Sequence, residues 1–260
     1  MSTNILTKRI EAARASGRLA LIPFLPAGYP DKQRFWDEID GLDASGADII
    51  EIGMPFSDPV ADGPVVEHAS LKCLDAGVNL KWILSELATR KGRYQAGLVL
   101  MGYLNPVLQY GLDAFARDAA SAGVHGVILA DVPFEEGDFI HAAFDPHGLA
   151  LIPLVGLNTE PSRMALYGNN AKGFAYFVSV LGTTGVRSQF DVSGLPPQLR
   201  QGLTHAKAAF PVPVALGFGL KHPDQLKDLE GLVDAAVFGS ALIRHIDQGG
   251  DAKGFMKVWK

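Results

Sequence analysis

The sequence has almost no cysteine, the residue that would cross-link an extracellular fold or form a cysteine-based metal site. Its 260 residues include one cysteine, Cys73. A single cysteine cannot form an intramolecular disulfide, and it has no second thiol to share a metal ion with. We therefore expect a protein of a reducing compartment, most simply the cytoplasm.

An excess of positive charge and long apolar runs are also missing. The net charge is −5, which offers no basic surface for a nucleic-acid backbone, so we expect no nucleic-acid partner. No run of about 18 apolar residues without a charge occurs, so we expect no membrane span. At the N-terminus, Ile5, Leu6 and Ile10 recur at helical spacing beside Glu11. This pattern favours a short helix of the fold over a cleaved transit peptide.

What the sequence does contain is a succession of short apolar, β-rich runs separated by amphipathic stretches. Strands that are apolar throughout and alternate with helices indicate a parallel sheet covered by helices. Eight such units predict one (β/α)8 TIM barrel domain over residues 1–260, with an additional N-terminal helix. An open doubly wound sheet is the alternative, but the three-glycine dinucleotide fingerprint after the first strand is missing. The predicted strands are 19–27, 47–54, 96–103, 123–132, 149–157, 173–180, 212–219 and 235–240.

Acidic residues are concentrated at the end of the second predicted strand, in the stretch "EIGMPFSDPVADGP". Glu51 stands between two isoleucines, so strand alternation points it away from them. A strand glutamate of this kind is either a general acid/base tuned by apolar surroundings or half of a buried ion pair. Asp62 follows in a loop restricted by three prolines, which suits a group that must be positioned. From the residues alone, Asp58 reads as a turn-forming acid.

Glycines mark the ends of three late strands, in "GTTG" at 182–185, "GFG" at 217–219 and Gly239–Ser240. In barrels, the loops after strands seven and eight and a helix N-terminus commonly bind phosphate through backbone N–H groups. Each glycine alone could serve only a tight turn. Together the three predict a phosphate-bearing ligand.

The sequence lacks the residues that other reactions of barrel enzymes require. No predicted strand contains the lysine that a Schiff-base aldolase needs. The seven histidines are scattered, and His125, inside a strand, reads as a packed core residue. We therefore expect no metal and no cofactor on this chain, and proton transfer by carboxylates on a phosphorylated substrate.

These motifs, with "YLNPV" after the third strand and "LADVPFEE" after the fourth, closely resemble the tryptophan synthase alpha chain family over nearly the whole sequence. The resemblance implies a (β/α)8 lyase that cleaves indole-3-glycerol phosphate to indole and glyceraldehyde 3-phosphate by a retro-aldol route. It makes Glu51 the proton donor to indole C3 and the acceptor of the glycerol 3'-hydroxyl proton. It also makes Asp62 the partner of the indole N–H, with Tyr176 beside the catalytic glutamate.

The resemblance implies further contacts with the substrate. Thr184 would meet the catalytic aspartate when its loop closes. Phosphate contacts fall on Gly185, Gly219, Gly239 and Ser240, and the indole pocket on Phe24, Met101, Ile128 and Phe218. From the residues alone, the last four could equally be barrel core.

The resemblance also implies a partner, a tryptophan synthase beta chain that carries pyridoxal phosphate in an alpha2-beta2 assembly. Pro55, Phe56, Asp58 and Pro59 would face it, with Phe56 and Asp58 exposed. Two other readings stay open: a stand-alone indole-3-glycerol-phosphate lyase, and a non-catalytic phosphate-binding barrel.

Overall fold

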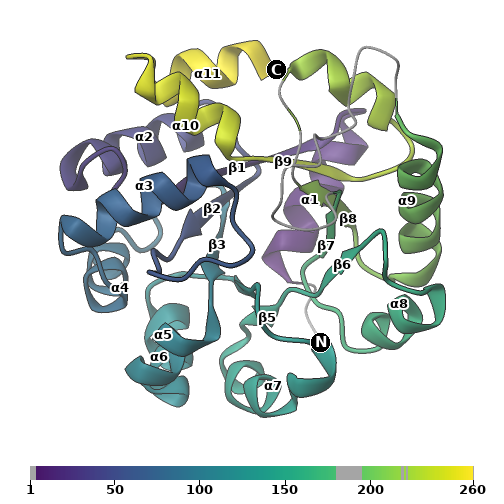
Figure 1. Ribbon diagram of the computed structural model, residues 1–260, viewed down its shortest axis with the longest axis horizontal. Coiled ribbons are helices and arrows are strands. Elements are labelled where there is room, and N and C mark those ends of the chain that lie inside the picture. The colour runs from purple at the N-terminus through teal and green to yellow at the C-terminus, as the bar shows by residue number, and fades with distance from the viewer. Residues whose placement is uncertain (1–3, 180–194, 218–219, 221, 260) are drawn as a thin grey trace.

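The computed structural model describes residues 4–179, 195–217, 220 and 222–259, and forms a ring of parallel strands surrounded by helices (Figure 1). Neighbouring strands follow the order β5-β4-β3-β2-β1-β9-β8-β7-β6, and every pairing is parallel. This is the predicted barrel. The strands are β1 (Ala20–Pro26), β2 (Ile49–Gly53), β3 (Gly97–Gly102), β4 (Gly126–Leu129), β5 (Ala150–Leu151), β6 (Leu154–Gly156), β7 (Ala175–Val178), β8 (Val214–Gly217) and β9 (Ala235–Phe238).

The fifth predicted strand, 149–157, is divided into β5 and β6, and this division closes the ring. Ile152 donates its N–H to Val127 on the β4 side at 2.9 Å, and Pro153 accepts the N–H of Tyr176 in β7 at 2.9 Å. Proline has no N–H to give to a ladder, so the strand is interrupted there while its two halves still join opposite neighbours.

Helices cover the outside of the barrel and alternate with the strands as predicted. The connection between β2 and β3 holds two of them, α3 and α4, which accounts for its length. None of the helices within the described ranges is long and apolar enough to cross a membrane. The helices after the first are α2 (Lys32–Ala44), α3 (Pro64–Asp75), α4 (Leu80–Thr89), α5 (Leu104–Tyr110), α6 (Leu112–Ser121), α7 (Asp138–Phe144), α8 (Pro161–Gly168), α9 (Pro197–Ala209), α10 (Ser240–Asp247) and α11 (Ala252–Trp259), with 3-10 turns at Phe134–Glu136, Asp145–His147 and Pro223–Leu229.

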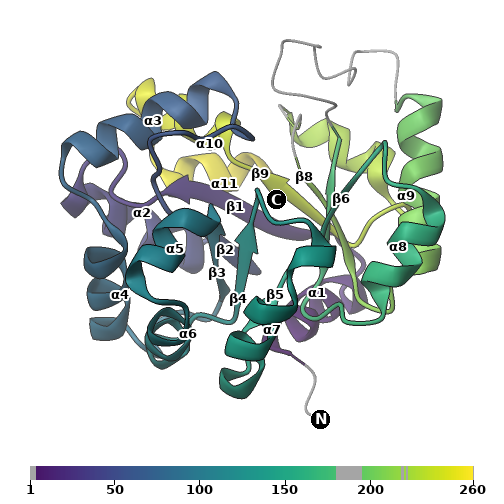
Figure 2. The ribbon, with the colours of Figure 1, turned by 60° about the horizontal axis from the view of Figure 1, so that its bottom comes forward.

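The predicted N-terminal helix is α1 (Ile5–Ala15), and it closes the end of the barrel at which the strands begin (Figure 2). Leu6 lies so close to Gly97, Gly126 and Gly173 that a Cβ on those glycines would come within 2.7, 2.8 and 3.2 Å of its methyl groups. The Thr7 hydroxyl donates to the Gly173 carbonyl at 2.7 Å. With this end filled, a ligand can enter only from the end at which the strands finish, where active sites of such barrels lie.

Candidate active site

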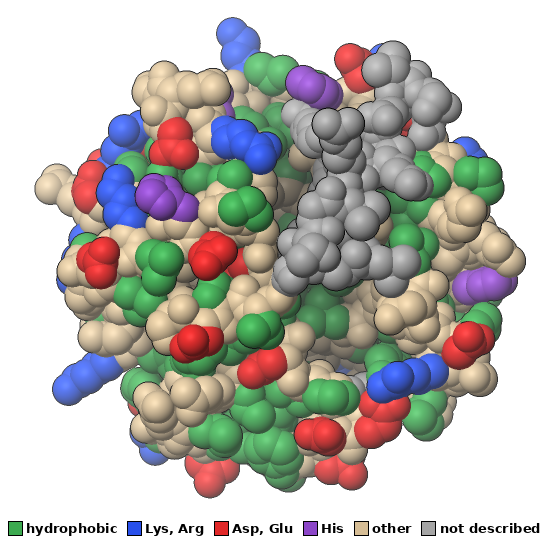
Figure 3. All heavy atoms as spheres, in the orientation of Figure 1, with side chains coloured by type: hydrophobic (Ala, Val, Ile, Leu, Met, Phe, Trp, Pro, Cys, Tyr) green, Lys and Arg blue, Asp and Glu red, His purple; other side chains and the backbone are tan. Residues whose placement is uncertain are grey.

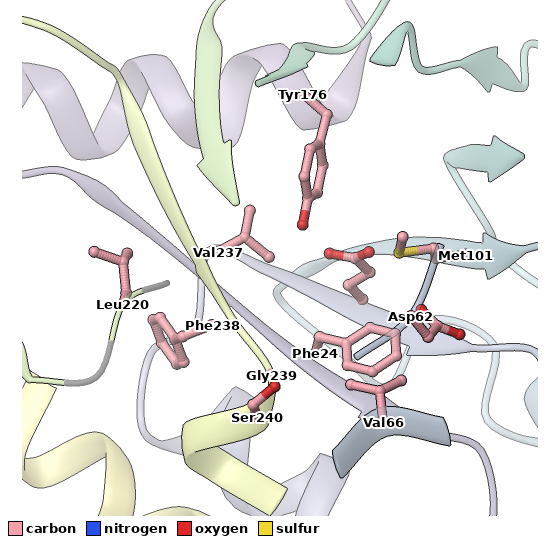
Figure 4. A pocket seen from close by; sticks show the side chains of 11 residues that line it. Phe24, Asp62, Val66, Met101, Tyr176, Leu220, Val237, Phe238, Gly239 and Ser240 are labelled. Carbon is pink, nitrogen blue, oxygen red and sulfur yellow. The ribbon is translucent and has the colours of Figure 1, made fainter. Parts of the chain in front are cut away.

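A pocket lies at the carboxyl ends of the strands, where the active sites of such barrels are built. Figure 4 shows Tyr176 reaching down from β7 into its centre, with Asp62, Met101 and Phe24 on one side and Gly239 and Ser240 at the start of α10. Its lining residues are Phe24, Glu51, Asp62, Val66, Met101, Tyr176, Leu220, Val237, Phe238, Gly239 and Ser240.

Glu51 occupies the middle of β2 and turns into this pocket, while its neighbours Ile50 and Ile52 are fully buried. The side chain is 1% exposed, and neither carboxylate oxygen has a hydrogen-bond partner within the described residues. Burying an ionised carboxylate without a partner is costly. The folded protein therefore favours the protonated acid.

Three other buried carboxylates show that this fold normally pairs such groups. Asp48 bonds Arg18 at 2.6 Å, Glu38 bonds Arg34 at 3.0 Å, and Asp234 bonds Lys207 at 2.7 Å. Glu51 has no such partner among the described residues, so the alternative of a buried ion pair is not what the structure shows. An unpaired buried carboxylate that faces a cavity is a candidate for proton transfer.

Burial and, to a smaller extent, the charge of Asp62 raise the pKa of Glu51 to about 8. Burial also raises the pKa of Asp62, to about 6, although a hydrogen bond with Tyr103 acts to lower it. Near neutral pH, Glu51 holds a proton to give while Asp62 is largely ionised. Two carboxyl groups whose environments separate their pKa values in this way can take the roles of acid and counter-charge.

Tyr176 contributes a phenol that stays neutral. Its side chain is 3% exposed, and burial, followed by the charges of Glu51 and Asp62, raises its pKa well above 10. The ring has room because Gly217, at the end of β8, lies against its hydroxyl end: a Cβ on Gly217 would lie 2.1 Å from the Tyr176 hydroxyl oxygen. Gly217 therefore serves close packing of the ring.

Phe24 is seated in the same manner between two glycines. A Cβ on Gly53 or on Gly239 would come within 2.7 Å of its ring. Phe24 also pairs in register with Glu51 across β1 and β2. The apolar ring thus lies beside the buried acid, where it can both contact a flat aromatic ligand and help exclude water.

The start of α10 forms the far side of the pocket. Gly239 precedes Ser240, the first residue of the helix, and both line the cavity. The first N–H groups of a helix have no partner within it and carry the positive end of the helix dipole. An anionic group of a ligand can bind there.

The structure brings together seven of the residues singled out in the sequence, Glu51, Asp62, Tyr176, Phe24, Met101, Gly239 and Ser240. Ile128 is fully buried in β4, paired in register with Met101, and does not line the cavity. Thr184, Gly185, Phe218 and Gly219 lie outside the described residues. The pocket is also lined by residues that were not anticipated, Val66, Leu220, Val237 and Phe238. The available signals were the apolar residue shortly after Asp62, the two before Gly239, and the one directly after Gly219.

The residues expected to face a partner lie in the β2–α3 loop. Asp58 is exposed and Pro59 partly so, but Pro55 is buried and Phe56, expected to be exposed, is only partly so. The ring of Phe56 packs against that of Tyr103 at a tilt, with centroids 5.2 Å apart. Within the described residues, no group of three or more His, Cys, Asp or Glu side chains is arranged to hold a metal ion.

A stability measurement can check the state of Glu51. Burial raises the pKa of this carboxyl group from its ordinary value of 4.5 to about 8 in the folded chain. Between these two pH values the folded chain holds the proton and the unfolded chain does not. The free energy of unfolding therefore falls as the pH rises from 4.5 to 8, and the loss stays constant above pH 8. We expect Glu51→Gln to remove the loss, a gain of up to about 3 kcal/mol near pH 7.

Urea unfolding of wild type and Glu51→Gln at pH 5 and pH 7.5 measures this gain. Glu11→Gln, at an exposed position of α1 at the closed end of the barrel, makes the same chemical change as a control. A stability difference between Glu51→Gln and wild type that is equal at both pH values would mean that Glu51 does not hold its proton in the folded chain.

Comparison with known proteins agrees with the geometry. Residues 10–257 match the family model described as "Tryptophan synthase alpha chain". The chain is 62% identical over 260 residues to the tryptophan synthase alpha chain of Maridesulfovibrio salexigens and 61% to that of Solidesulfovibrio magneticus, with both chains covered completely in each case. A structure of Mycobacterium tuberculosis tryptophan synthase superimposes with a TM-score of 0.89 at 34% identity, covering 99% of this chain and 97% of that one.

Proposed function

The chain belongs to the tryptophan synthase alpha chain family, lyases that cleave indole-3-glycerol phosphate in tryptophan biosynthesis, and we propose that Glu51 and Asp62 carry the reaction in the pocket described above. The observation that carries the proposal is the buried, unpaired Glu51 facing a cavity that is also lined by Asp62 and the start of a helix. That arrangement supplies a proton donor, a counter-charge and an anion site.

The reaction follows from these charges. Glu51 donates its proton to indole C3, which leaves the positive charge on the ring nitrogen, and ionised Asp62 accepts the N–H and stabilises that charge. The Glu51 carboxylate then takes the proton of the glycerol 3'-hydroxyl. As the C3–C3' bond breaks, its electrons return to the ring to give neutral indole, and the hydroxyl carbon becomes the aldehyde of glyceraldehyde 3-phosphate. Glu51 regains a proton, so it acts as acid and then as base.

Shape and polarity agree with such a substrate. The aromatic ring of the substrate would lie against Phe24 and Met101 near Asp62, and its phosphate at Gly239 and Ser240. The buried phenol of Tyr176 lies between these ends, where it can hydrogen-bond a reacting oxygen. Gly185 and Gly219 complete the phosphate site in this proposal, with Thr184 facing Asp62 and Phe218 the indole ring.

The proposal includes a tryptophan synthase beta chain as partner, which would carry pyridoxal phosphate in an alpha2-beta2 assembly in the cytoplasm. The loop that holds Asp62 borders a groove lined by residues that include Pro55, Phe56 and Pro106. Val60, Leu108 and Phe139, all located after barrel strands, expose 69, 48 and 47% of their surface. Figure 3, in the orientation of Figure 1, shows hydrophobic side chains among acidic ones on the viewed surface. The exposed Val60, within the loop that holds Asp62, and the neighbouring groove suit a docking surface.

Indole release from indole-3-glycerol phosphate by the chain alone, and then with a beta chain, tests the proposal. We expect slow release alone and faster release in a complex that elutes as an alpha2-beta2 species, because the partner orders loops around Asp62. Absence of release in both conditions would refute the assignment of the reaction. Release without co-elution or acceleration would instead identify a stand-alone lyase.

The proposed phosphate site at the start of α10 can be tested separately. Ser240→Asp places a negative charge where the substrate phosphate would bind, so we expect glycerol 3-phosphate affinity to fall at least 10-fold with little change in folding stability, because Ser240 is not in the buried core. Competition of glycerol 3-phosphate with substrate measures it, and Ser240→Asn is the uncharged control. Equal competition in Ser240→Asp and wild type would remove the phosphate from this position.

A further inference from the structure

The β2–α3 loop must hold Asp62 at a fixed place, although most of its own bonds are local. Asp62 donates its N–H to Pro59 at 3.0 Å, and Val60 donates to Asp58 at 2.9 Å. Such bonds shape the loop but do not attach it to the barrel. Among the described residues, segment 55–62 hydrogen-bonds the rest of the barrel through one side chain, Tyr103.

Tyr103 is well suited to anchor the loop. It follows β3 directly, precedes the first residue of α5, and is 3% exposed. Its hydroxyl oxygen accepts the N–H of Ala61 at 3.0 Å, and its ring packs against that of Phe56 with the planes inclined by 32°. The phenol therefore contacts the loop at two points, one residue and six residues before Asp62.

The hydroxyl group has one proton, and the bond from Ala61 leaves that proton free to be donated. The Asp62 carboxylate is the neighbour of this hydroxyl on the side chain of the next residue, and their interaction acts to lower the pKa of Asp62. With the oxygen bonded by the Ala61 N–H and the ring packed against Phe56, the hydroxyl proton is available to that carboxylate. Donation of such a proton favours the ionised form of an acid.

We infer that Tyr103 is a positioning residue for the reaction, which anchors the β2–α3 loop so that the Asp62 carboxylate is held against the substrate N–H. Tyr103 does not line the pocket and acts through Asp62. The inference rests on the proposed role of Asp62. It extends that role to a residue 41 positions along the chain, directly after the barrel strand β3.

Tyr103→Phe tests the inference because it removes the hydroxyl and keeps the ring that packs against Phe56. We expect kcat for indole release to fall about 10-fold near pH 7 while glycerol 3-phosphate affinity stays within about 2-fold. The acid limb of the kcat/KM profile should move up by about one pH unit, because Asp62 loses a bond that favours its ionised form, and activity should partly recover above that limb. A carboxyl NMR titration of Asp62 should show the same shift without any activity measurement.

Tyr110→Phe is the matched control, because Tyr110 donates to a carboxylate, Asp118 at 2.8 Å, that does not line the active-site pocket, whereas Asp62 does. It should leave kcat and the acid limb unchanged. The inference is overturned if Tyr103→Phe keeps wild-type kcat, or loses activity with no change in the acid limb or the Asp62 titration. If wild type itself releases no indole, or if Asp62→Asn is fully active, the proposed function fails instead, whatever Tyr103→Phe does.

Discussion

Glu51→Gln should lower kcat for indole release by roughly 10²- to 10⁴-fold, the loss typical of a general acid/base group. Glutamine keeps the size and shape of the side chain but has no proton to donate to indole C3. Phe24, Met101 and the start of α10 are untouched, so glycerol 3-phosphate should bind almost normally. The loss should therefore appear in kcat and kcat/KM together.

Single-turnover indole release, with glycerol 3-phosphate affinity measured on the same samples, separates chemistry from binding. Glu11→Gln at the closed end of the barrel is the control and should behave as wild type. Near-normal cleavage by Glu51→Gln would remove Glu51 from the mechanism. Together with the stability gain expected of the same variant near pH 7, loss of activity would show that the fold keeps a destabilising group for its chemistry.

Much of this site follows from local sequence rules. The alternation of Ile50, Glu51 and Ile52 places the acid on the inner face of β2, and the structure has it there. The glycine before "SALI" predicts a strand ending in a helix start, and α10 begins at Ser240. Such rules work because strand alternation and helix starts are set by neighbouring residues.

Features that depend on distant contacts were not predictable in the same way. The unpaired state of Glu51 rests on which side chains surround it in three dimensions, and the sequence left an ion pair open. Tyr103 could not be linked to Asp62, because the contact joins two loops 42 residues apart at Ala61. The interruption of the fifth strand did have a local signal, Pro153, which cannot donate to a ladder.

Asp62 should be almost as important as Glu51, but for a different reason. Asp62→Asn keeps an oxygen for the indole N–H and removes the negative charge, so we expect kcat to fall about 100-fold or more, as when a preorganised electrostatic group is lost. Asp62→Glu keeps the charge on a longer side chain and should retain more activity than Asp62→Asn. Single-turnover indole release measures both, and wild-type rates in Asp62→Asn would exclude charge stabilisation by this residue.

The double variant Glu51→Gln, Asp62→Asn decides whether the two carboxyl groups act on one transition state. Proton donation by Glu51 creates the positive charge that Asp62 stabilises, so neither group is of use without the other. We therefore expect the double variant to be barely slower than the slower single variant, as residues that act as a unit are strongly non-additive. Losses that multiply would indicate independent contributions. Asp62 would then serve substrate binding, and glycerol 3-phosphate or indole affinity would have to change in Asp62→Asn to account for its effect.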